Sequence, residues 1–390
     1  MPSTHTWDIF CTVVDNYGDI GVCWRLARQL AAELGIKVRL WVDDLESFRR
    51  ICPDIVPRRE SQLSHGVEVR WWREPFPAVT PADVVVEAFA CNPPASYVRA
   101  MAAKEPKPAW INLEFLSAED WVRGCHGLPS PQPALGITKY FFFPGFVSGT
   151  GGLLAEPGLM HARDQFQHSV AEQAHFWERL GLGLPRAGEA QISLFCYENP
   201  AIAGLLRAWS DGGTPMRCLV PAGVATQAIS AFFGTEYLAA GTVLRKSSLE
   251  VKVFSFMGQY DYDRLLWACD FNLVRGEDSF VRAQWAARPF LWHIYPQNDQ
   301  AHWVKLQAFL GLYCRDLPRD IVEVVRTLWE VWNQDDGAQV EPRWTGFWRY
   351  RAELQAHAGQ WAAQIAKNGD LANNLAKFCG NLLKYRALDT

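Results

Sequence analysis

The residues from Arg275 to Ser279 combine groups suited to holding a sugar nucleotide. They follow an apolar segment, Asp270–Val274, that predicts a buried strand, and they precede a run of good helix formers, Phe280–Ala287. A strand, a tight glycine turn and a helix start together aim backbone N–H groups at an anion, and the serine can cap the helix. The turn also carries two adjacent carboxylates, which would repel a bare phosphate. We therefore predict a ligand with phosphate at one end and hydroxyl groups at the other.

A second stretch whose residues could take part in chemistry, Asp15–Gly21, joins the first predicted strand, Trp7–Val14, to a helix. Asp15 and Asp19 lie four residues apart at this junction, where a carboxylate can act as a general base. The stretch lacks the G-x-G-x-x-G spacing of dinucleotide-binding turns. On residue chemistry alone, the catalytic interpretation has the same weight as the ordinary one. In the ordinary one, Asp19 caps the helix and Asp15 closes the turn.

Aromatic side chains near further strand ends can stack a nucleobase. Phe195 and Tyr197 alternate along one strand, so they point the same way. Phe256 and Gln259 lie at the end of a later strand, where a ring can cover the base and an amide can read its edge. Tyr295 follows another strand and can close the phosphate pocket. The alternatives are core packing for the rings and an ordinary loop for Tyr295.

Composition excludes several classes of function. The nine histidines include no H-x-x-H spacing, so we expect no metal site. The net charge of −4 argues against a nucleic-acid-coating surface, and we expect no direct nucleic-acid partner. Ten scattered cysteines without a C-x-x-C pair are typical of a reducing compartment. No signal-peptide pattern and no run of transmembrane length is found, so we expect a cytoplasmic protein with no membrane partner.

The elements that must position these residues form two alternating series of strands and helices. Such a series predicts a parallel sheet covered on both faces, and ligands bind at the carboxyl ends of its strands. At 390 residues the chain exceeds the usual size of one core. We predict an α/β protein with two Rossmann-like domains, at 1–185 and 190–343, facing a shared cleft. Residues 344–390 are predicted to form a helical tail that packs back towards the N-terminal domain.

With both stretches in view, the chain resembles the EarP family of protein-arginine rhamnosyltransferases, which modify bacterial translation elongation factor P. The resemblance rests on Asp15–Gly21 with Trp24–Arg28, and on Arg275–Gln284 with Trp292–Gln297. It covers nearly the whole chain and is weakest around residues 155–190 and near the C-terminus. It implies a GT-B glycosyltransferase fold and inverting transfer of rhamnose from dTDP-β-L-rhamnose to an arginine of elongation factor P. No metal or other cofactor is implied.

The resemblance also implies roles for individual residues. It makes Asp19 the general base and Asp15 a second essential carboxylate. The donor-binding residues that it implies are Phe195, Tyr197, Phe256, Gln259, Arg275, Glu277, Asp278, Ser279 and Tyr295. The residues expected to line the cleft between donor and acceptor are Asn16, Tyr17, Gly18 and Gly21.

Two other functions remain open. One is another GT-B nucleotide-sugar enzyme, either an epimerase or a transferase with a different donor or acceptor. The other is a non-catalytic module that only docks on a translation factor. The Asp15 and Asp19 pair beside a complete donor-side turn weighs against the second.

Overall fold

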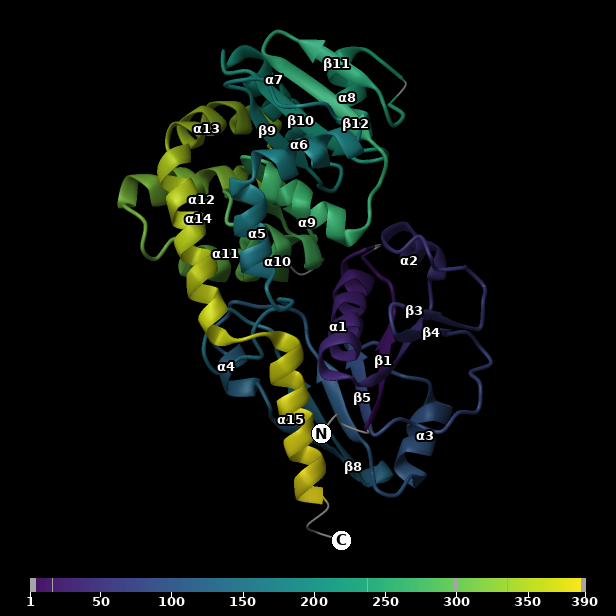
Figure 1. The fold of residues 1–390 in the computed structure, drawn as a ribbon. Coiled ribbons are helices and arrows are strands. Elements are labelled where there is room, and N and C mark those ends of the chain that lie inside the picture. Colours follow the sequence, from purple (N-terminus) through teal and green to yellow (C-terminus); the bar gives the residue numbers. More distant parts are fainter. Residues whose placement is uncertain (1–4, 16, 237, 298–299, 335, 387–390) are drawn as a thin grey trace. The chain divides into compact units, whose positions relative to one another are not determined.

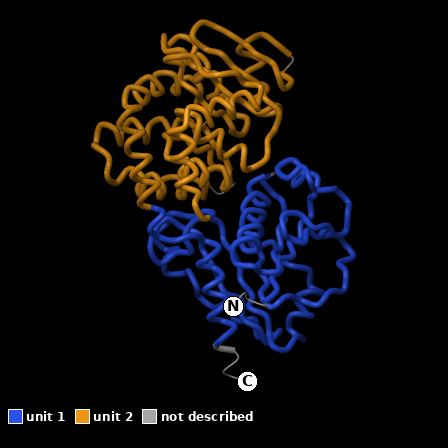
Figure 2. The backbone as a smooth tube through the Cα atoms, viewed as in Figure 1, with its two compact units in different colours: residues 1–156, 365–390 blue, residues 157–364 orange. Residues whose placement is uncertain are grey.

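The chain divides into two compact units. A computed structural model describes residues 5–15, 17–236, 238–297, 300–334 and 336–386. Unit 1 comprises Met1–Glu156 and Ile365–Thr390, and unit 2 comprises Pro157–Gln364 (Figure 2). This division differs from the bounds expected from the sequence, because residues 157–185 and 344–364 belong to unit 2. The chain then returns to unit 1 for its last helix.

Unit 1 is built on an eight-stranded sheet with the order β3-β4-β2-β1-β5-β6-β8-β7 (Figure 1). Its strands are β1 (Thr6–Cys11), β2 (Lys37–Val42), β3 (Ser61–Ser64), β4 (Val67–Trp71), β5 (Val84–Ala88), β6 (Ala109–Leu113), β7 (Pro129–Gln132) and β8 (Ile137–Phe142). The six central strands are parallel, as predicted, so their carboxyl ends lie at one edge. The outermost strands β3 and β7 pair antiparallel with β4 and β8, and neither was predicted from the sequence.

Helices α1 and α15 pack against each other in unit 1. The helices of this unit are α1 (Gly18–Leu34), α2 (Leu45–Ile51), α3 (Ala95–Ala103), α4 (Val122–Cys125) and α15 (Leu371–Arg386), with 3-10 turns η1 (Pro133–Leu135) and η2 (Ala366–Asn368). Gly35 ends α1 in the left-handed conformation (φ 63°), the glycine C-cap that the sequence predicts. Helix α15 also contacts β6, and Leu371 donates its N–H to the Leu153 carbonyl at 3.0 Å.

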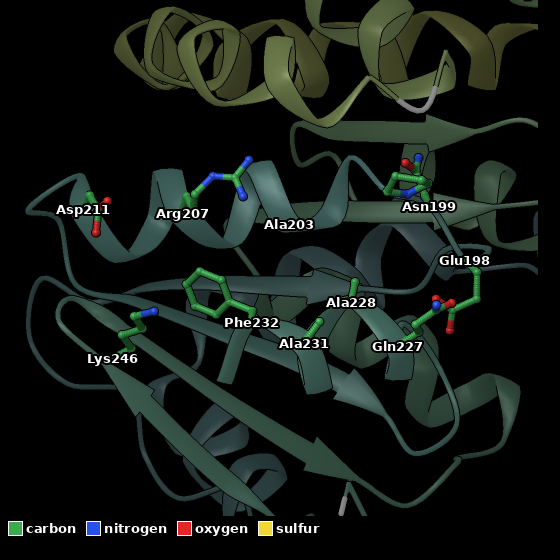
Figure 3. Close-up of a pocket in the computed structure, with 11 residues that line it drawn as sticks. Glu198, Asn199, Ala203, Arg207, Asp211, Gln227, Ala228, Ala231, Phe232 and Lys246 are labelled. Atoms are coloured by element: carbon green, nitrogen blue, oxygen red, sulfur yellow. The ribbon is translucent and has the colours of Figure 1, made fainter. Parts of the chain in front are cut away.

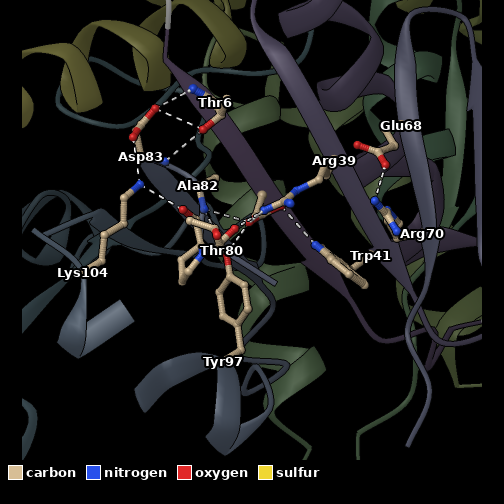
Figure 4. A network of polar contacts seen from close by, with 12 residues as sticks. Thr6, Arg39, Trp41, Glu68, Arg70, Thr80, Ala82, Asp83, Tyr97 and Lys104 are labelled. Atoms are coloured by element: carbon tan, nitrogen blue, oxygen red, sulfur yellow. Dashed lines mark hydrogen bonds and ion pairs between the residues drawn. The ribbon is translucent and has the colours of Figure 1, made fainter. Parts of the chain in front are cut away.

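A buried ion pair ties β1 to β2 and α3. The fully buried Asp8 carboxylate accepts hydrogen bonds from Arg39 Nε at 2.6 Å and from Trp41 Nε1 at 3.1 Å. The Tyr97 hydroxyl donates to the same carboxylate, and burial beside Asp8 raises the pKa of Tyr97. The side chains of Arg39, Trp41 and Tyr97 converge in Figure 4. A charge removed from water needs several such partners, and here they fix three elements at once.

Unit 2 has a six-stranded sheet with the order β11-β12-β10-β9-β13-β14. Its strands are β9 (Ala190–Leu194), β10 (Met216–Pro221), β11 (Val243–Lys246), β12 (Leu249–Phe254), β13 (Phe271–Arg275) and β14 (Phe290–His293). The sequence predicts five strands here, at 191–197, 216–221, 251–256, 271–274 and 289–294. All five are present and parallel, whereas the antiparallel edge strand β11 was not predicted.

Helices pack around the unit 2 sheet (Figure 1). They are α5 (Leu159–His168), α6 (Val170–Arg179), α7 (Ile202–Asp211), α8 (Thr226–Phe233), α9 (Gln259–Ala268), α10 (Asp278–Trp285), α11 (Ala301–Tyr313), α12 (Arg319–Asn333), α13 (Gly337–Arg349) and α14 (Arg351–Ile365). The sequence predicts one helical segment over 163–180. The structure instead has α5 and α6, because Ser169 leaves the helical conformation and caps α6 through Glu172 N–H. Within the described residues, no helix has the length and apolarity needed to cross a membrane.

Candidate active site

The turn between β1 and α1 places a buried carboxylate at the edge of the unit 1 sheet. Asp19 is 5% exposed. Its Oδ2 accepts hydrogen bonds from the backbone N–H groups of Val14 at 2.8 Å and Asp15 at 2.9 Å. The side chain therefore reaches back from the first turn of α1 across the loop that leaves β1. This arrangement holds the carboxylate in one orientation before any ligand arrives.

The ordinary role considered for Asp19, capping helix α1, is wrong. The helix begins at Gly18 with Tyr17 as its N-cap residue, and no side chain caps it. The other part of that interpretation is confirmed, since Asp15 closes the turn: its carbonyl accepts a hydrogen bond from Gly18 N–H at 2.7 Å. The Asp19 carboxylate therefore binds the preceding loop and not the helix start.

Burial shapes the acid–base behaviour of Asp19. Removal from water raises its pKa, and the two backbone hydrogen bonds from Asp15 and Val14 oppose that rise. The net shift is upward, so the ionised carboxylate binds a proton more strongly than an ordinary aspartate does. A carboxylate in this state suits proton abstraction.

Asp43 is a second, half-buried carboxylate at this edge, and it was not selected from the sequence. It follows β2, the strand next to β1, and its Oδ1 accepts from Val13 N–H at 2.9 Å and Asp44 N–H at 2.8 Å. Burial raises its pKa as well. Two carboxylates thus hold the consecutive amides of Val13 and Val14. The available signal was an aspartate directly after a strand that pairs with β1.

The residues expected to line the cleft lie in or next to the same turn. A Cβ atom on Gly18 would lie 2.8 Å from Asp15 Oδ2, so only glycine leaves that carboxylate in place. The Tyr17 hydroxyl accepts a hydrogen bond from Arg50 Nη1 at 3.2 Å. Gly21 donates its N–H to the Tyr17 carbonyl inside the helix. Asn16 lies outside the described residues.

In unit 2, an arginine lies between two aromatic rings. The Arg275 guanidinium carbon is 4.7 Å from the ring centroids of both Phe195 and Tyr197. Both rings follow the end of β9, and Arg275 ends the neighbouring strand β13. Phe256 packs edge-on against Phe195 with centroids 6.1 Å apart. The planar cation is therefore held by stacking at the carboxyl edge of the sheet.

The glycine turn after β13 has the predicted form but a different use of its serine. Gly276 has a φ of 58°, and α10 begins at Asp278 with Glu277 as N-cap residue. Ser279 does not cap this helix. Its Oγ accepts from Arg275 N–H at 3.1 Å and donates to the Arg275 carbonyl. Ser279 therefore braces the end of β13, and no side-chain hydrogen bond caps the start of α10.

The remaining predicted donor-side residues join the same cluster. Asp278 Oδ2 accepts a hydrogen bond from Gln259 Nε2 at 3.0 Å. Tyr295, 43% exposed, packs edge-on against Tyr197 with centroids 5.6 Å apart. The structure thus brings the predicted residues after β9, β12, β13 and β14 together.

Two further side chains in this cluster, those of His293 and Tyr262, were not predicted. The His293 ring lies 5.1 Å from Tyr197, and burial together with the Arg275 charge lowers its pKa to about 3. It is therefore neutral at ordinary pH. Tyr262 lies 5.5 Å from Phe195, and burial raises the pKa of its hydroxyl. His293 ends β14 and pairs with Arg275, and the available signal was its place in the stretch Trp292–Gln297.

A cavity of about 730 Å³ in unit 2 lies apart from these residues. It runs between α7 and α8, and Arg207, Phe232 and Lys246 are among the side chains that line it (Figure 3). None of the predicted site residues contributes to its lining. Among the described residues, no group of three or more His, Cys, Asp or Glu side chains is arranged to hold a metal ion.

Comparison with known proteins gives consistent results. Residues 7–380 match the family model described as elongation factor P (EF-P) rhamnosyltransferase EarP. A protein-arginine rhamnosyltransferase of Pseudomonas putida is 52% identical, over 97% of this chain and 99% of that protein. One from Neisseria meningitidis is 34% identical, over 97% and 98%.

Solved structures agree at the level of the fold. A structure described as the basis for EarP-mediated arginine glycosylation of EF-P has a TM-score of 0.69 and 37% identity, covering 97% of this chain and 99% of that one. A glycosyltransferase of Rickettsia africae has a TM-score of 0.51 at 10% identity, covering 98% and 97%, which supports the fold alone. Together with the two parallel-rich sheets, these likenesses confirm the predicted GT-B fold.

Proposed function

This chain belongs to the EarP family of EF-P rhamnosyltransferases, and from that premise we propose that it transfers rhamnose from dTDP-β-L-rhamnose to an arginine of EF-P. The observation that carries the proposal is the buried Asp19, held by two backbone N–H groups and with a raised pKa. A transferase that glycosylates arginine needs such a group, because the guanidinium is cationic at ordinary pH and a poor nucleophile.

Asp19 acts as the general base in this proposal. As the arginine nitrogen attacks the anomeric carbon of rhamnose, the bond from that carbon to the dTDP diphosphate breaks on the opposite face. The configuration inverts, the diphosphate leaves with the electron pair, and Asp19 takes the proton of the nitrogen. Asp15, as the second carboxylate, orients the cationic guanidinium for attack on the anomeric carbon. General-base catalysis of this kind is worth roughly 10²–10⁴-fold in rate.

The donor binds, in this proposal, at the carboxyl edge of the unit 2 sheet. Thymine and deoxyribose lie against Phe195, Tyr197, Phe256 and Gln259. The diphosphate lies near the start of α10, where backbone N–H groups face it. Arg275 supplies positive charge, and Tyr295 and Ser279 line the same site.

The carboxylates of the glycine turn have separate roles. Asp278 accepts from Gln259, and this bond supports a role in ordering the loop. We assign Glu277 to the hydroxyl groups of the sugar or ribose. The charge of the leaving diphosphate is met by Arg275, by tyrosine hydroxyls and by backbone N–H groups, so we propose transfer without a metal. Because the acceptor is a translation factor, we place the reaction in the cytoplasm.

The donor assignment is tested by competition. Transfer from dTDP-rhamnose should be inhibited by dTDP and little affected by equal concentrations of UDP- or GDP-sugars. Turnover of a UDP-sugar with no acceptor protein would instead support the alternative of a GT-B epimerase. Binding of EF-P without donor turnover would support a docking module.

A further inference from the structure

The carboxyl edge of the unit 1 sheet carries a stacked pair of phenylalanines that the proposed chemistry does not use. Phe89 follows β5 and Phe115 follows β6, and their ring centroids are 4.5 Å apart with 21° between the planes. Phe115 is 40% exposed, although its side chain has no hydrogen-bonding group. A stacked pair with one exposed ring offers a flat apolar surface that another apolar group can pack against.

The backbone that presents Phe89 is strained and firmly held. Phe89, Ala90 and Asn92 have φ angles of 57°, 53° and 52°, in the left-handed region that costs energy for residues other than glycine. Phe89 N–H donates to the Leu113 carbonyl at 2.7 Å, and Ala90 N–H donates to Asn112 Oδ1 at 3.2 Å. Strain of this kind persists only where its surroundings enforce it, and it concentrates at binding and catalytic sites.

The phenylalanine pair follows β5 and β6, the first and second neighbours of the strand that leads to Asp19. In the sheet order β1-β5-β6, Phe10 pairs with Glu87, and Glu87 pairs with Asn112. Neighbouring strands are about 4.8 Å apart, so both loops begin within about 10 Å of the end of β1. The loop that continues β1 contains Val14, whose N–H binds the Asp19 carboxylate. The rings and the carboxylate therefore share one stretch of the sheet edge.

The side chains at this edge of the sheet indicate which kind of polypeptide segment can bind there. The carboxylates of Asp15 and Asp19 attract a cation, while the adjacent rings favour apolar groups. A segment that satisfies both carries an arginine with apolar neighbours. We propose that Phe89 and Phe115 form a docking platform for the loop of the acceptor protein that carries the modified arginine. The platform contacts the apolar side chains beside that arginine while the guanidinium reaches Asp19.

This inference rests on the proposed function and names where the acceptor docks. The platform does not touch the reacting atoms, so its loss changes acceptor affinity and not the chemical step. Phe115→Ala should raise the KM for EF-P about tenfold or more, as expected for an aromatic anchor. The kcat at saturating EF-P and the affinity for dTDP should stay at wild-type values. Phe115→Trp should restore the KM.

Leu63→Ala provides the matched control. Leu63 is 77% exposed on β3, an edge strand of the same sheet that lies on the other side of β1 from β5 and β6. Its truncation should therefore leave the KM for EF-P unchanged. A Phe115→Ala variant that modifies EF-P with the wild-type KM would contradict the proposed docking role and leave the proposed function intact. Failure of the wild-type protein to modify EF-P would overturn the proposed function itself.

A measurement on the wild-type protein removes any dependence on how the variants fold. Hydroxyl-radical footprinting should show Phe115 protected when EF-P is added at saturating concentration, while Leu63 stays reactive. A Phe115 ring that reacts equally fast with and without bound EF-P would overturn the platform.

Discussion

At the scale of single residues, the proposed transfer depends on the charge of Asp19. Replacing it with asparagine keeps the shape and the hydrogen bonds to Val14 and Asp15, but removes the proton acceptor. Asp19→Asn should lower kcat by at least about 100-fold, the usual range for a general base. Binding of dTDP, measured by calorimetry, should remain at the wild-type level.

Asp43→Asn is the matched control for that substitution. Asp43 is a half-buried carboxylate that also has a raised pKa, and it binds the adjacent amide of Val13. Because Asp43 has no assigned part in proton transfer, its variant should keep most of the activity. If Asp19→Asn retained wild-type kcat, the assignment of the base would be wrong.

The pH dependence follows from the same residue. Asp19 accepts a proton only when ionised, and burial raises its pKa above the ordinary value of 3.8. The acid limb of the kcat/KM profile should therefore have its midpoint above 3.8, with activity lost as pH falls through it. The acceptor arginine stays protonated well above neutral pH and adds no limb near neutrality. A profile that stays flat down to pH 4, in protein shown to be folded by circular dichroism, would contradict this.

At the scale of elements, close helix packing in unit 2 depends on one glycine. A Cβ atom on Gly204 of α7 would overlap the carbonyl oxygen of Gly337 at the start of α13. Gly204→Ala should therefore destabilise the protein by about 1–3 kcal/mol, the usual cost of overpacking. Urea-induced unfolding measures this cost.

Gly359→Ala is the control for the packing prediction. Gly359 is a helical glycine in α14, and a Cβ atom added to it would meet no neighbouring atom within 4 Å, so alanine enters open space there. The substitution should stabilise the protein by up to about 1 kcal/mol through helix propensity. Equal stability of the Gly204→Ala variant and the wild type would contradict the predicted overlap with Gly337.

The elements also show what a sequence can and cannot predict. The central strands were predictable because parallel strands buried on both faces are continuous apolar runs. The edge strands β3, β7 and β11 were not predictable. Each has only four residues, and it is a strand only because it pairs with its neighbour. The gathering of Phe195, Tyr197 and Arg275 at one sheet edge was predictable from strand ends and turns. The roles of Ser279 and Asp43 were not, because they depend on which backbone groups the folded loops bring within reach.

At the scale of the whole molecule, the last helix completes unit 1 although it follows unit 2 in the chain. Leu375 of α15 is fully buried in a helix that packs against α1 and β6. Leu375→Asp places an unpaired charge in that core, so it should increase hydrogen exchange in α1 and β6 and abolish transfer. Lys377→Asp, on the exposed side of the same helix, should change neither.

Binding of dTDP to the same variant shows whether the donor site depends on unit 1. The proposed dTDP site lies wholly in unit 2, so the Leu375→Asp variant should still bind dTDP. Loss of dTDP binding together with transfer would mean that the donor site needs unit 1.

The most direct test of the whole account is the mass of EF-P after incubation with this protein and dTDP-rhamnose. We expect one deoxyhexose increment, mapped by fragmentation to a single arginine, with the wild-type protein and none with Asp19→Asn. Unmodified EF-P, under conditions in which the wild-type protein is folded and binds dTDP, would contradict the account.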